Sequence, residues 1–342
     1  MTIYLSYDQE TLDTQYSPSS CVPDITVYMT EYAQRSAAAR ERLDVEVGVR
    51  YGQRPEESFD LFPARDPGGP LLVFVHGGYW QEVSKNESAF MAPDLVPAGV
   101  SVAALGYGLA PAYTLPEIIA MAAGGIRWIC ANLDHLPGKP GSVYLAGCSA
   151  GAHLIAMALL DEVGWRRTGT RAVDAVAGAI LLSGVYDLEP VARTYVNAPL
   201  GLDTATARAC SPTHHLGPAL PPLVVARGEH ETDEFGRQQR EFVHAVRALG
   251  GDVTDLVARS RNHFDLAYDL GRPGTELGDA TAKLLGRREK RRAPHGVEVS
   301  EGSTTDGIRD LHGRGIDGQR ARELGNVTGE PRIGVGGRDR RG

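Results

Sequence analysis

The sequence is organised around residues 143–151, which read VYLAGCSAG. The apolar residues at its start predict a buried strand, and Gly-x-Ser-x-Gly then predicts a sharp turn into an amphipathic helix over Ala152–Leu160. In such a turn the central serine takes a positive φ, and the backbone comes so close that Gly147 and Gly151 leave no room for a side chain. The N–H groups that begin the helix favour a developing negative charge near the serine. The stretch therefore favours Ser149 as a nucleophile over an ordinary turn of small residues.

Apolar runs alternate with helical patterns on both sides of this turn, which predicts a parallel sheet with right-handed crossovers. A Gly-x-Ser-x-Gly turn in that setting is typical of the α/β-hydrolase fold, with a mostly parallel central sheet and helices on both faces. An antiparallel pair is expected at the start of the sheet, because a turn at residues 52–55 separates its first two strands. Outside 143–148, the predicted strands are 43–51, 58–62, 71–75, 100–105, 177–182, 222–226 and 252–258, and the main predicted helices are 23–40, 114–133, 233–249 and 276–285.

A glycine pair follows the strand predicted at 71–75, in the segment His76-Gly77-Gly78. Glycines leave backbone N–H groups free to approach a ligand, and a His-Gly-Gly loop supplies oxyanion donors in lipases and esterases. Together with the N–H of Ala150, the N–H groups of Gly77 and Gly78 are expected to form an oxyanion hole. The alternative is a glycine-rich turn that the neighbouring aromatic residues merely stiffen.

A serine nucleophile requires a base, and in this fold the base follows the last strand. Of the ten histidines, His263 alone has that position, directly after the strand predicted at 252–258 and before the closing helix. His153 lies one helical turn beyond Ser149, and His76 belongs to the oxyanion loop, where it is expected to brace the loop rather than transfer protons. His263 is therefore the candidate general base.

The acid that orients the base has several candidates, because chain order places it between the serine and the histidine. Spacing along the chain does not show which carboxylate reaches Nδ1 of His263. Most carboxylates in such a run are solvated, or cap the helix that follows. The candidates are Asp187, Glu229, Glu231, Asp233 and Glu234.

Composition excludes some classes of function. The net charge of −8 argues against nucleic acid as the default partner. The four cysteines show neither CxxC pairs nor metal-ligand spacing with histidine, so they are expected to be reduced thiols of a cytoplasmic protein. The first residues lack the basic and apolar regions of a signal peptide, and no apolar run is long enough for a membrane span. No membrane association is expected.

Three segments are predicted from composition: an N-terminal cap segment over residues 1–40, a catalytic domain over 41–285, and a tail over 286–342. The tail holds 13 Lys and Arg against 9 Asp and Glu and few large apolar residues, so it is expected to be a disordered basic extension. Its cluster at 287–292 offers a contact for nucleic acid or an acidic partner, but a solvated extension is favoured.

A family resemblance is carried by the segments 15–19 (QYSPS), 76–80 (HGGYW), the 147–151 elbow, 231–235 (ETDEF) with Arg237 and Gln238, and 262–265 (NHFD). These segments resemble kynurenine formamidase (arylformamidase), a family within the hormone-sensitive-lipase-like group of α/β-hydrolases. The resemblance implies hydrolysis of N-formyl-L-kynurenine to L-kynurenine and formate in tryptophan catabolism, without cofactor or metal. It also implies Ser149 as nucleophile, His263 as base and Glu231 as acid, at a position where the family commonly has aspartate, with Asp233 as the alternative.

The resemblance also indicates how a small aryl formamide would be held. A formyl group is small, so specificity is expected on the aryl side, where Tyr79 and Trp80 are candidates for contacting the ring. Two other functions are consistent with the same residues. One is a carboxylesterase of broad acyl preference, and the other is a non-catalytic binding module on a hydrolase fold.

Overall fold

The computed structural model describes residues 2–217 and 219–286, which lie within one compact unit. The predicted tail falls outside these residues, apart from Gly286 at the end of the last helix. The helices are α1 (Gln9–Gln15), α2 (Ile25–Arg42), α3 (Ala92–Leu95), α4 (Leu115–Ala131), α5 (Ala150–Leu160), α6 (Glu162–Arg167), α7 (Ala172–Ala175), α8 (Asn197–Leu200), α9 (Thr204–Ala209), α10 (Asp233–Ala248) and α11 (Glu276–Gly286).

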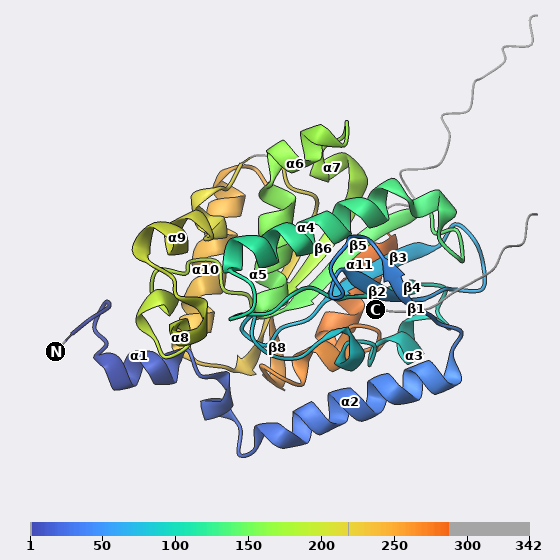
Figure 1. Ribbon diagram of the computed structural model, residues 1–342. Helices are drawn as coiled ribbons and strands as arrows, with labels where there is room; N and C mark the ends of the chain where they lie inside the picture. Colours follow the sequence, from blue (N-terminus) through green and yellow to red (C-terminus); the bar gives the residue numbers. More distant parts are fainter. Residues whose placement is uncertain (1, 218, 287–342) are drawn as a thin grey trace, which may run out of the picture. The chain divides into compact units, whose positions relative to one another are not determined.

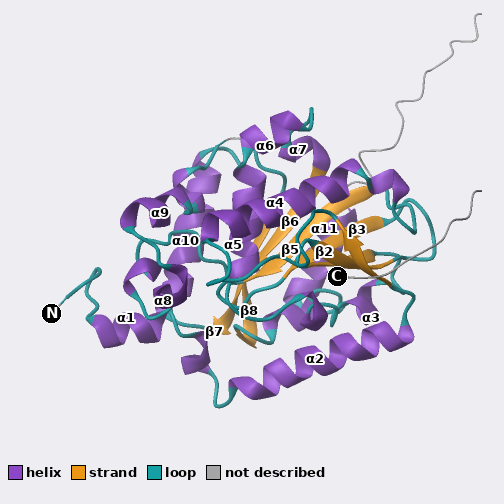
Figure 2. Ribbon diagram, viewed as in Figure 1, coloured by secondary structure: helices purple, strands orange, loops and turns teal. Residues whose placement is uncertain are grey.

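An eight-stranded sheet forms the centre of this unit, in the order β1-β2-β4-β3-β5-β6-β7-β8 (Figures 1 and 2). β2 pairs antiparallel with β1 and β4, and all other pairs are parallel. The predicted α/β-hydrolase fold and its antiparallel start are therefore confirmed. The strands are β1 (Glu46–Arg50), β2 (Ser58–Phe62), β3 (Pro70–Val75), β4 (Ser101–Leu105), β5 (Ser142–Cys148), β6 (Val176–Leu182), β7 (Leu223–His230) and β8 (Val253–Asn262).

Helices cover both faces of the sheet because successive side chains of a strand point to opposite sides. In β3, Leu71, Val73 and Val75 pack into the core beneath α4, α5 and α10. Leu72 and Phe74 pack on the other face, with residues of α3 and α11. Figure 1 shows α4 and α5 on one side of the strands and α2 and α3 on the other.

Helix α5 differs from the amphipathic helix predicted after the elbow. Nearly all of its residues are buried, because it packs against β5 and β6 on one side and against α4 and α7 on the other. Small residues such as Ala152 and Ala156 allow this close approach on several sides.

The last two strands run further than their apolar runs predict. β7 continues to His230 and β8 to Asn262, and the two remain paired there through a register shift after Gly228. A Cβ on Gly228 would lie 2.4 Å from the carbonyl oxygen of Arg261. β8 is the edge strand, and many of its side chains are exposed to solvent. Polar residues can therefore continue the strand beyond residue 258, where the apolar pattern ends. Leu249, the last residue of the helix predicted at 233–249, instead caps α10 and is 42% exposed.

The segment between α1 and α2 is attached to the start of α10 by polar contacts. The hydroxyl of Tyr16 donates to Oε2 of Glu234 at 2.8 Å and accepts from Nε2 of Gln238 at 2.9 Å. Thr232 Oγ1 donates to the carbonyl oxygen of Gln15 at 2.6 Å. Because α10 follows β7, these bonds hold the N-terminal segment near the carboxyl ends of the parallel strands.

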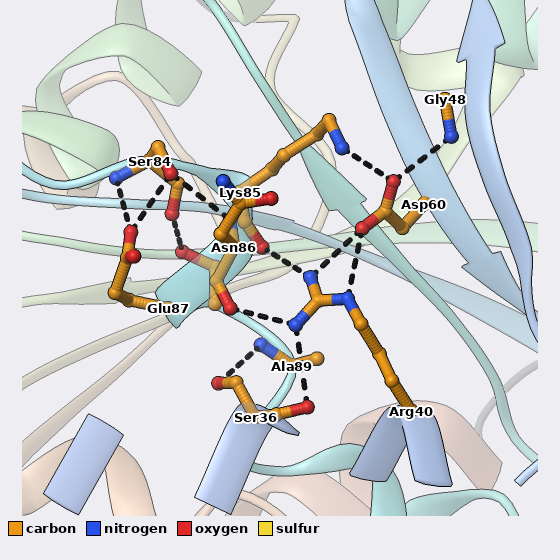
Figure 3. A network of polar contacts seen from close by, with 10 residues as sticks. Ser36, Arg40, Gly48, Asp60, Ser84, Lys85, Asn86, Glu87 and Ala89 are labelled. Carbon is orange, nitrogen blue, oxygen red and sulfur yellow. Dashed lines mark hydrogen bonds and ion pairs between the residues drawn. The ribbon is translucent and has the colours of Figure 1, made fainter. Parts of the chain in front are cut away.

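A buried carboxylate fixes the other end of α2 (Figure 3). Asp60 on β2 is fully buried and accepts from Nζ of Lys85 at 2.5 Å and from Nη2 of Arg40 at 2.8 Å. Burial raises the pKa of Asp60, but hydrogen bonds from Lys85, Arg40 and the Gly48 amide outweigh it and bring the pKa below its usual value. Arg40 also donates to the carbonyl oxygens of Lys85 and Asn86. The network therefore joins α2, β2 and the loop that contains residues 84–89.

Candidate active site

Ser149 lies in the turn between β5 and α5 with φ 56° and ψ −117°, which confirms the strained conformation predicted for the elbow. Its amide donates to the carbonyl oxygen of Leu182 at 2.8 Å, and the residue is 4% exposed. A Cβ on Gly151 would lie 2.0 Å from the carbonyl oxygen of Val75, and one on Gly147 would lie 2.7 Å from the backbone of Gly151. Glycine is therefore required on both sides of the serine.

The structure brings Glu231 to His263. Nδ1 of His263, directly after β8, lies 3.0 Å from Oε2 of Glu231, and the two side chains are 6% and 1% exposed. A carboxylate oxygen can only accept, so Nδ1 carries the proton and Nε2 has the free lone pair that a general base needs. Asp233 instead lies exposed in the first turn of α10, and Asp187 accepts from the amide of Glu189 at 3.0 Å.

The other oxygen of Glu231 is held by two donors that sequence reasoning missed. Oε1 accepts from Ser183 Oγ at 2.7 Å and from the amide of Gly228 at 2.6 Å. Ser183 follows β6, is 2% exposed and has φ 49°, so the backbone is strained at a second serine beside the site. The only sequence signal for it is a Ser-Gly pair at the carboxyl end of a predicted strand.

Replacing Ser183 by alanine is expected to lower kcat about tenfold with little change in KM, because Glu231 loses a hydrogen bond that fixes its carboxylate. Ser183→Gly is the matched variant, since it also lacks the hydroxyl but relieves the positive φ. We expect both variants to lose the same kcat, with a higher melting temperature for the glycine variant. Activity that follows melting temperature instead would show that Ser183 acts only through stability.

The predicted oxyanion loop lies against Ser149. Among the described residues, the amides of Gly77, Gly78 and Ala150 donate to no backbone carbonyl, so they are free for a ligand oxygen. A Cβ on Gly77 would lie 3.3 Å from Cβ of Ser149 and 2.9 Å from the carbonyl oxygen of Cys148. Gly78 has φ 92°, a conformation that favours glycine.

Tyr107, two residues after the end of β4, holds this loop. Its hydroxyl donates to the carbonyl oxygen of His76 at 2.7 Å, and its ring stacks on the His76 ring with centroids 4.1 Å apart. His76 is fixed between the end of β3 and this tyrosine, as a bracing residue would be. Burial lowers its pKa to about 4, so the ring is neutral near pH 7.

Trp80 does not lie where the sequence predicted it. The indole is fully buried, and its Nε1 donates to Nδ1 of His153 at 3.2 Å, while His153 Nε2 donates to the carbonyl oxygen of Cys210 at 2.7 Å. Burial lowers the pKa of His153 to about 4. Trp80 and His153 thus form a neutral pair inside the protein and do not line the cavity beside Ser149.

A cavity of about 300 Å³ opens beside Ser149, His263, Gly77 and Gly78. Tyr79 lines this cavity, and its hydroxyl donates to the carbonyl oxygen of Tyr16 at 2.6 Å. A separate cavity of about 360 Å³, near the amino ends of β3 and β5, contains none of the predicted site residues. The other aromatic residues of the catalytic cavity are Tyr32, Phe74, Phe90, Tyr195 and Phe264, and its N-terminal wall is formed by Pro18, Ser19, Ile25 and Met29.

Two features are absent from the described part of the chain. Across residues 2–217 and 219–286, no cluster of three or more His, Cys, Asp and Glu side chains is arranged to hold a metal ion. In the same residues, no helix has both the length and the apolar character needed to cross a bilayer.

Comparison with known proteins agrees with this geometry. A family model described as BD-FAE matches residues 61–243. Kynurenine formamidase of Danio rerio is 31% identical over 300 residues, which cover 84% of this chain and 100% of that protein. A probable isoprenylcysteine alpha-carbonyl methylesterase of Oryza sativa subsp. japonica is 34% identical over 244 residues, or 64% of this chain and 58% of that one.

A solved structure supports the same fold. A protein provisionally named a thioesterase, from Silicibacter sp. tm1040, superposes with a TM-score of 0.70 and 26% identity over 79% of this chain and 98% of its own. Fold, elbow and sequence similarity along the whole length of a relative lead to one conclusion: the chain belongs to the kynurenine formamidase family of α/β-hydrolases.

Proposed function

We propose that the protein hydrolyses N-formyl-L-kynurenine to L-kynurenine and formate. The observation that carries the proposal is the His263–Glu231 pair beside Ser149, in a chain that aligns with the full length of a kynurenine formamidase. Ser149 and His263 line the same cavity, which supports the roles of nucleophile and base.

In the proposed reaction, Ser149 Oγ attacks the formyl carbon while Nε2 of His263 takes the hydroxyl proton. Glu231 holds the imidazole and stabilises its positive charge. The carbonyl oxygen becomes an oxyanion that accepts from the amides of Gly77, Gly78 and Ala150. His263 then protonates the arylamine as the C–N bond breaks, and water hydrolyses the formyl-enzyme by the same steps.

The cavity lining supports an aryl leaving group. Six aromatic residues surround the space next to Ser149, and among them Tyr79 and Phe264 follow the catalytic segments directly. Aromatic faces and edges pack well against a planar ring. Gly77 also lies against the serine, since a Cβ on Gly77 would be 3.3 Å from Cβ of Ser149, which supports its amide as an oxyanion donor.

An ester substrate is the second candidate, and the similarity to a plant methylesterase supports it. The two proposals are separated by kcat/KM for N-formyl-L-kynurenine and for p-nitrophenyl acetate with the same enzyme. We expect the formamide value to be higher by at least about tenfold, although its amide bond is intrinsically less reactive. A value for the ester that equals or exceeds it would refute the specific function.

We infer that the protein acts in the cytoplasm on this small molecule. Its four cysteines are all free thiols, and two of them, Cys148 and Cys210, are buried. Burial raises the pKa of the Cys148 thiol, so it remains protonated and inert, as expected for reduced cysteines in a reducing compartment.

A further inference from the structure

The cavity beside Ser149 is lined on one side by hydrogen-bond acceptors that have no donor, and the first of them is His76. Nδ1 of His76 lies 3.0 Å from the carbonyl oxygen of Gly77, which can only accept, so the ring proton belongs to Nδ1. Nε2 is therefore a lone pair. It is buried, and it has no hydrogen-bond partner among the described residues. A buried polar atom without a hydrogen-bond partner lowers the stability of the folded protein. His76 is also one of the residues that line the cavity beside Ser149.

Glu87 lies on the same wall, close enough for its charge to act on His76. Its Oε2 accepts from the amide and hydroxyl of Ser84 at 2.9 and 2.8 Å (Figure 3). Within the described chain, Oε1 accepts no hydrogen bond. The Arg40 and Asp60 network fixes the loop that carries Glu87, so the carboxylate is held in place before a ligand arrives.

The charged side chains that line the cavity are acidic. Glu82 and Glu87 are present, and the lining residues include no lysine or arginine. Lys85, two residues before Glu87, and Arg40, which contacts the same loop, both point toward Asp60 instead (Figure 3).

Three other donors of the lining are already used. The hydroxyls of Tyr32 and Tyr79 donate to backbone carbonyls, as does the amide of Gln81. The unpaired acceptors and the negative charge of the lining therefore lie at His76, Glu82 and Glu87, while the hydroxyl of Ser19 is a lining donor that makes no hydrogen bond within the described chain.

We propose that His76 Nε2 and Glu87 bind an ammonium group on the leaving-group side of the substrate. The inference rests on the proposed function and refines it: the enzyme selects aryl formamides whose aryl group carries a protonated primary amine. An ammonium group has three N–H donors and one positive charge. An N–H can donate to the lone pair of His76 Nε2, and the charge is attracted by the carboxylate of Glu87. An anionic substituent finds no cation on this wall.

The first test compares substrates of the wild-type enzyme. N-formyl-L-kynurenine is measured against an analogue with hydrogen in place of its α-amino group and against one with hydrogen in place of its carboxylate. We expect kcat/KM to fall about tenfold or more without the amine and not to fall without the carboxylate. Equal values with and without the amine would overturn the proposal.

The second test uses Glu87→Gln, which removes the charge but keeps an oxygen to accept from Ser84. We expect kcat/KM for N-formyl-L-kynurenine to fall about tenfold, with turnover of the analogue without the amine and of p-nitrophenyl acetate unchanged. Glu117→Gln is the matched control, because Glu117 accepts from Thr114 in the same capping arrangement at 2.9 and 2.8 Å outside this cavity. An equal loss for all three substrates would assign Glu87 a structural role and overturn the proposal.

A third measurement separates this inference from the proposed function. L-kynurenine is tested as a competitive inhibitor of p-nitrophenyl acetate hydrolysis, which requires no formamidase activity. We expect its inhibition constant to rise about tenfold in Glu87→Gln and to stay constant in Glu117→Gln. If wild type hydrolyses no formamide but this difference appears, the proposed function fails and the ammonium site stands. If formamide is hydrolysed and the difference is absent, the ammonium site fails alone.

Discussion

Ser149→Ala is expected to lower kcat for N-formyl-L-kynurenine and for p-nitrophenyl acetate by about 10⁵- to 10⁶-fold, the loss typical for the nucleophile of a serine triad. The hydroxyl makes the bond to the acyl carbon, and the other parts of the site cannot replace it. Alanine adds no atom and retains the Cβ of serine, so the elbow at φ 56° keeps its geometry. The melting temperature is expected to stay within a few degrees of wild type.

The same variant decides between an enzyme and a non-catalytic binding module. L-kynurenine should still bind to Ser149→Ala, because the aromatic lining and Glu87 are intact. Binding is measured by calorimetry, and turnover is measured with enough enzyme to detect about 10⁻⁶ of the wild-type rate. Turnover that remains within tenfold of wild type would exclude Ser149 as the nucleophile.

Glu231→Gln is expected to lower kcat by about 10⁴-fold, since removing the charge from a triad acid typically has that effect. Glutamine keeps an oxygen for Ser183 and the Gly228 amide, so its NH₂ group replaces Oε2 at 3.0 Å from Nδ1 of His263. A donor then faces a donor, and the imidazole adopts the wrong tautomer. The pair is buried, so water cannot take the place of the lost acceptor.

Two further variants test why this position holds a glutamate. Glu231→Asp withdraws the carboxylate by one methylene and is expected to cost about 10- to 100-fold in kcat, because small displacements in a catalytic array are expensive. Asp233→Asn is the matched control at an exposed carboxylate two residues further on, in the first turn of α10, and its kcat should stay within about twofold of wild type. If Asp233→Asn loses as much as Glu231→Gln, the assignment of the acid is wrong.

The sequence alone determined those parts of the site that depend on local geometry. Ser149 and its glycines are dictated by a turn in which a Cβ would meet backbone at 2.0 Å. The oxyanion glycines and His263 are likewise set by their places directly after a strand, since the carboxyl ends of parallel strands meet at one edge of the sheet. Most strands also followed from their apolar runs, because both faces of the central sheet are buried.

Only the tertiary structure shows which of two nearby residues in the chain takes part in the site. Glu231 and Asp233 are two residues apart, yet one contacts His263 and the other lies in solvent, because β7 extends to His230 and α10 starts at Asp233. Nothing in the polar sequence 227–234 indicates that extension, which depends on pairing with β8. Ser183 was missed for the same reason, since its partner lies 48 residues away.

The substrate side of the cavity depends even more on long-range packing. Tyr79 and Trp80 are adjacent in sequence. Trp80 is buried against His153, whereas Tyr79 lines the cavity beside Ser149. The N-terminal residues 18–32 and the loop at 84–88 complete the wall only because Tyr16 and Asp60 attach them to distant strands and helices. Local sterics and strand order thus fixed the catalytic chemistry in the sequence, whereas the choice of acid and the shape and charge of the substrate wall arise from contacts between segments that only the folded chain brings together.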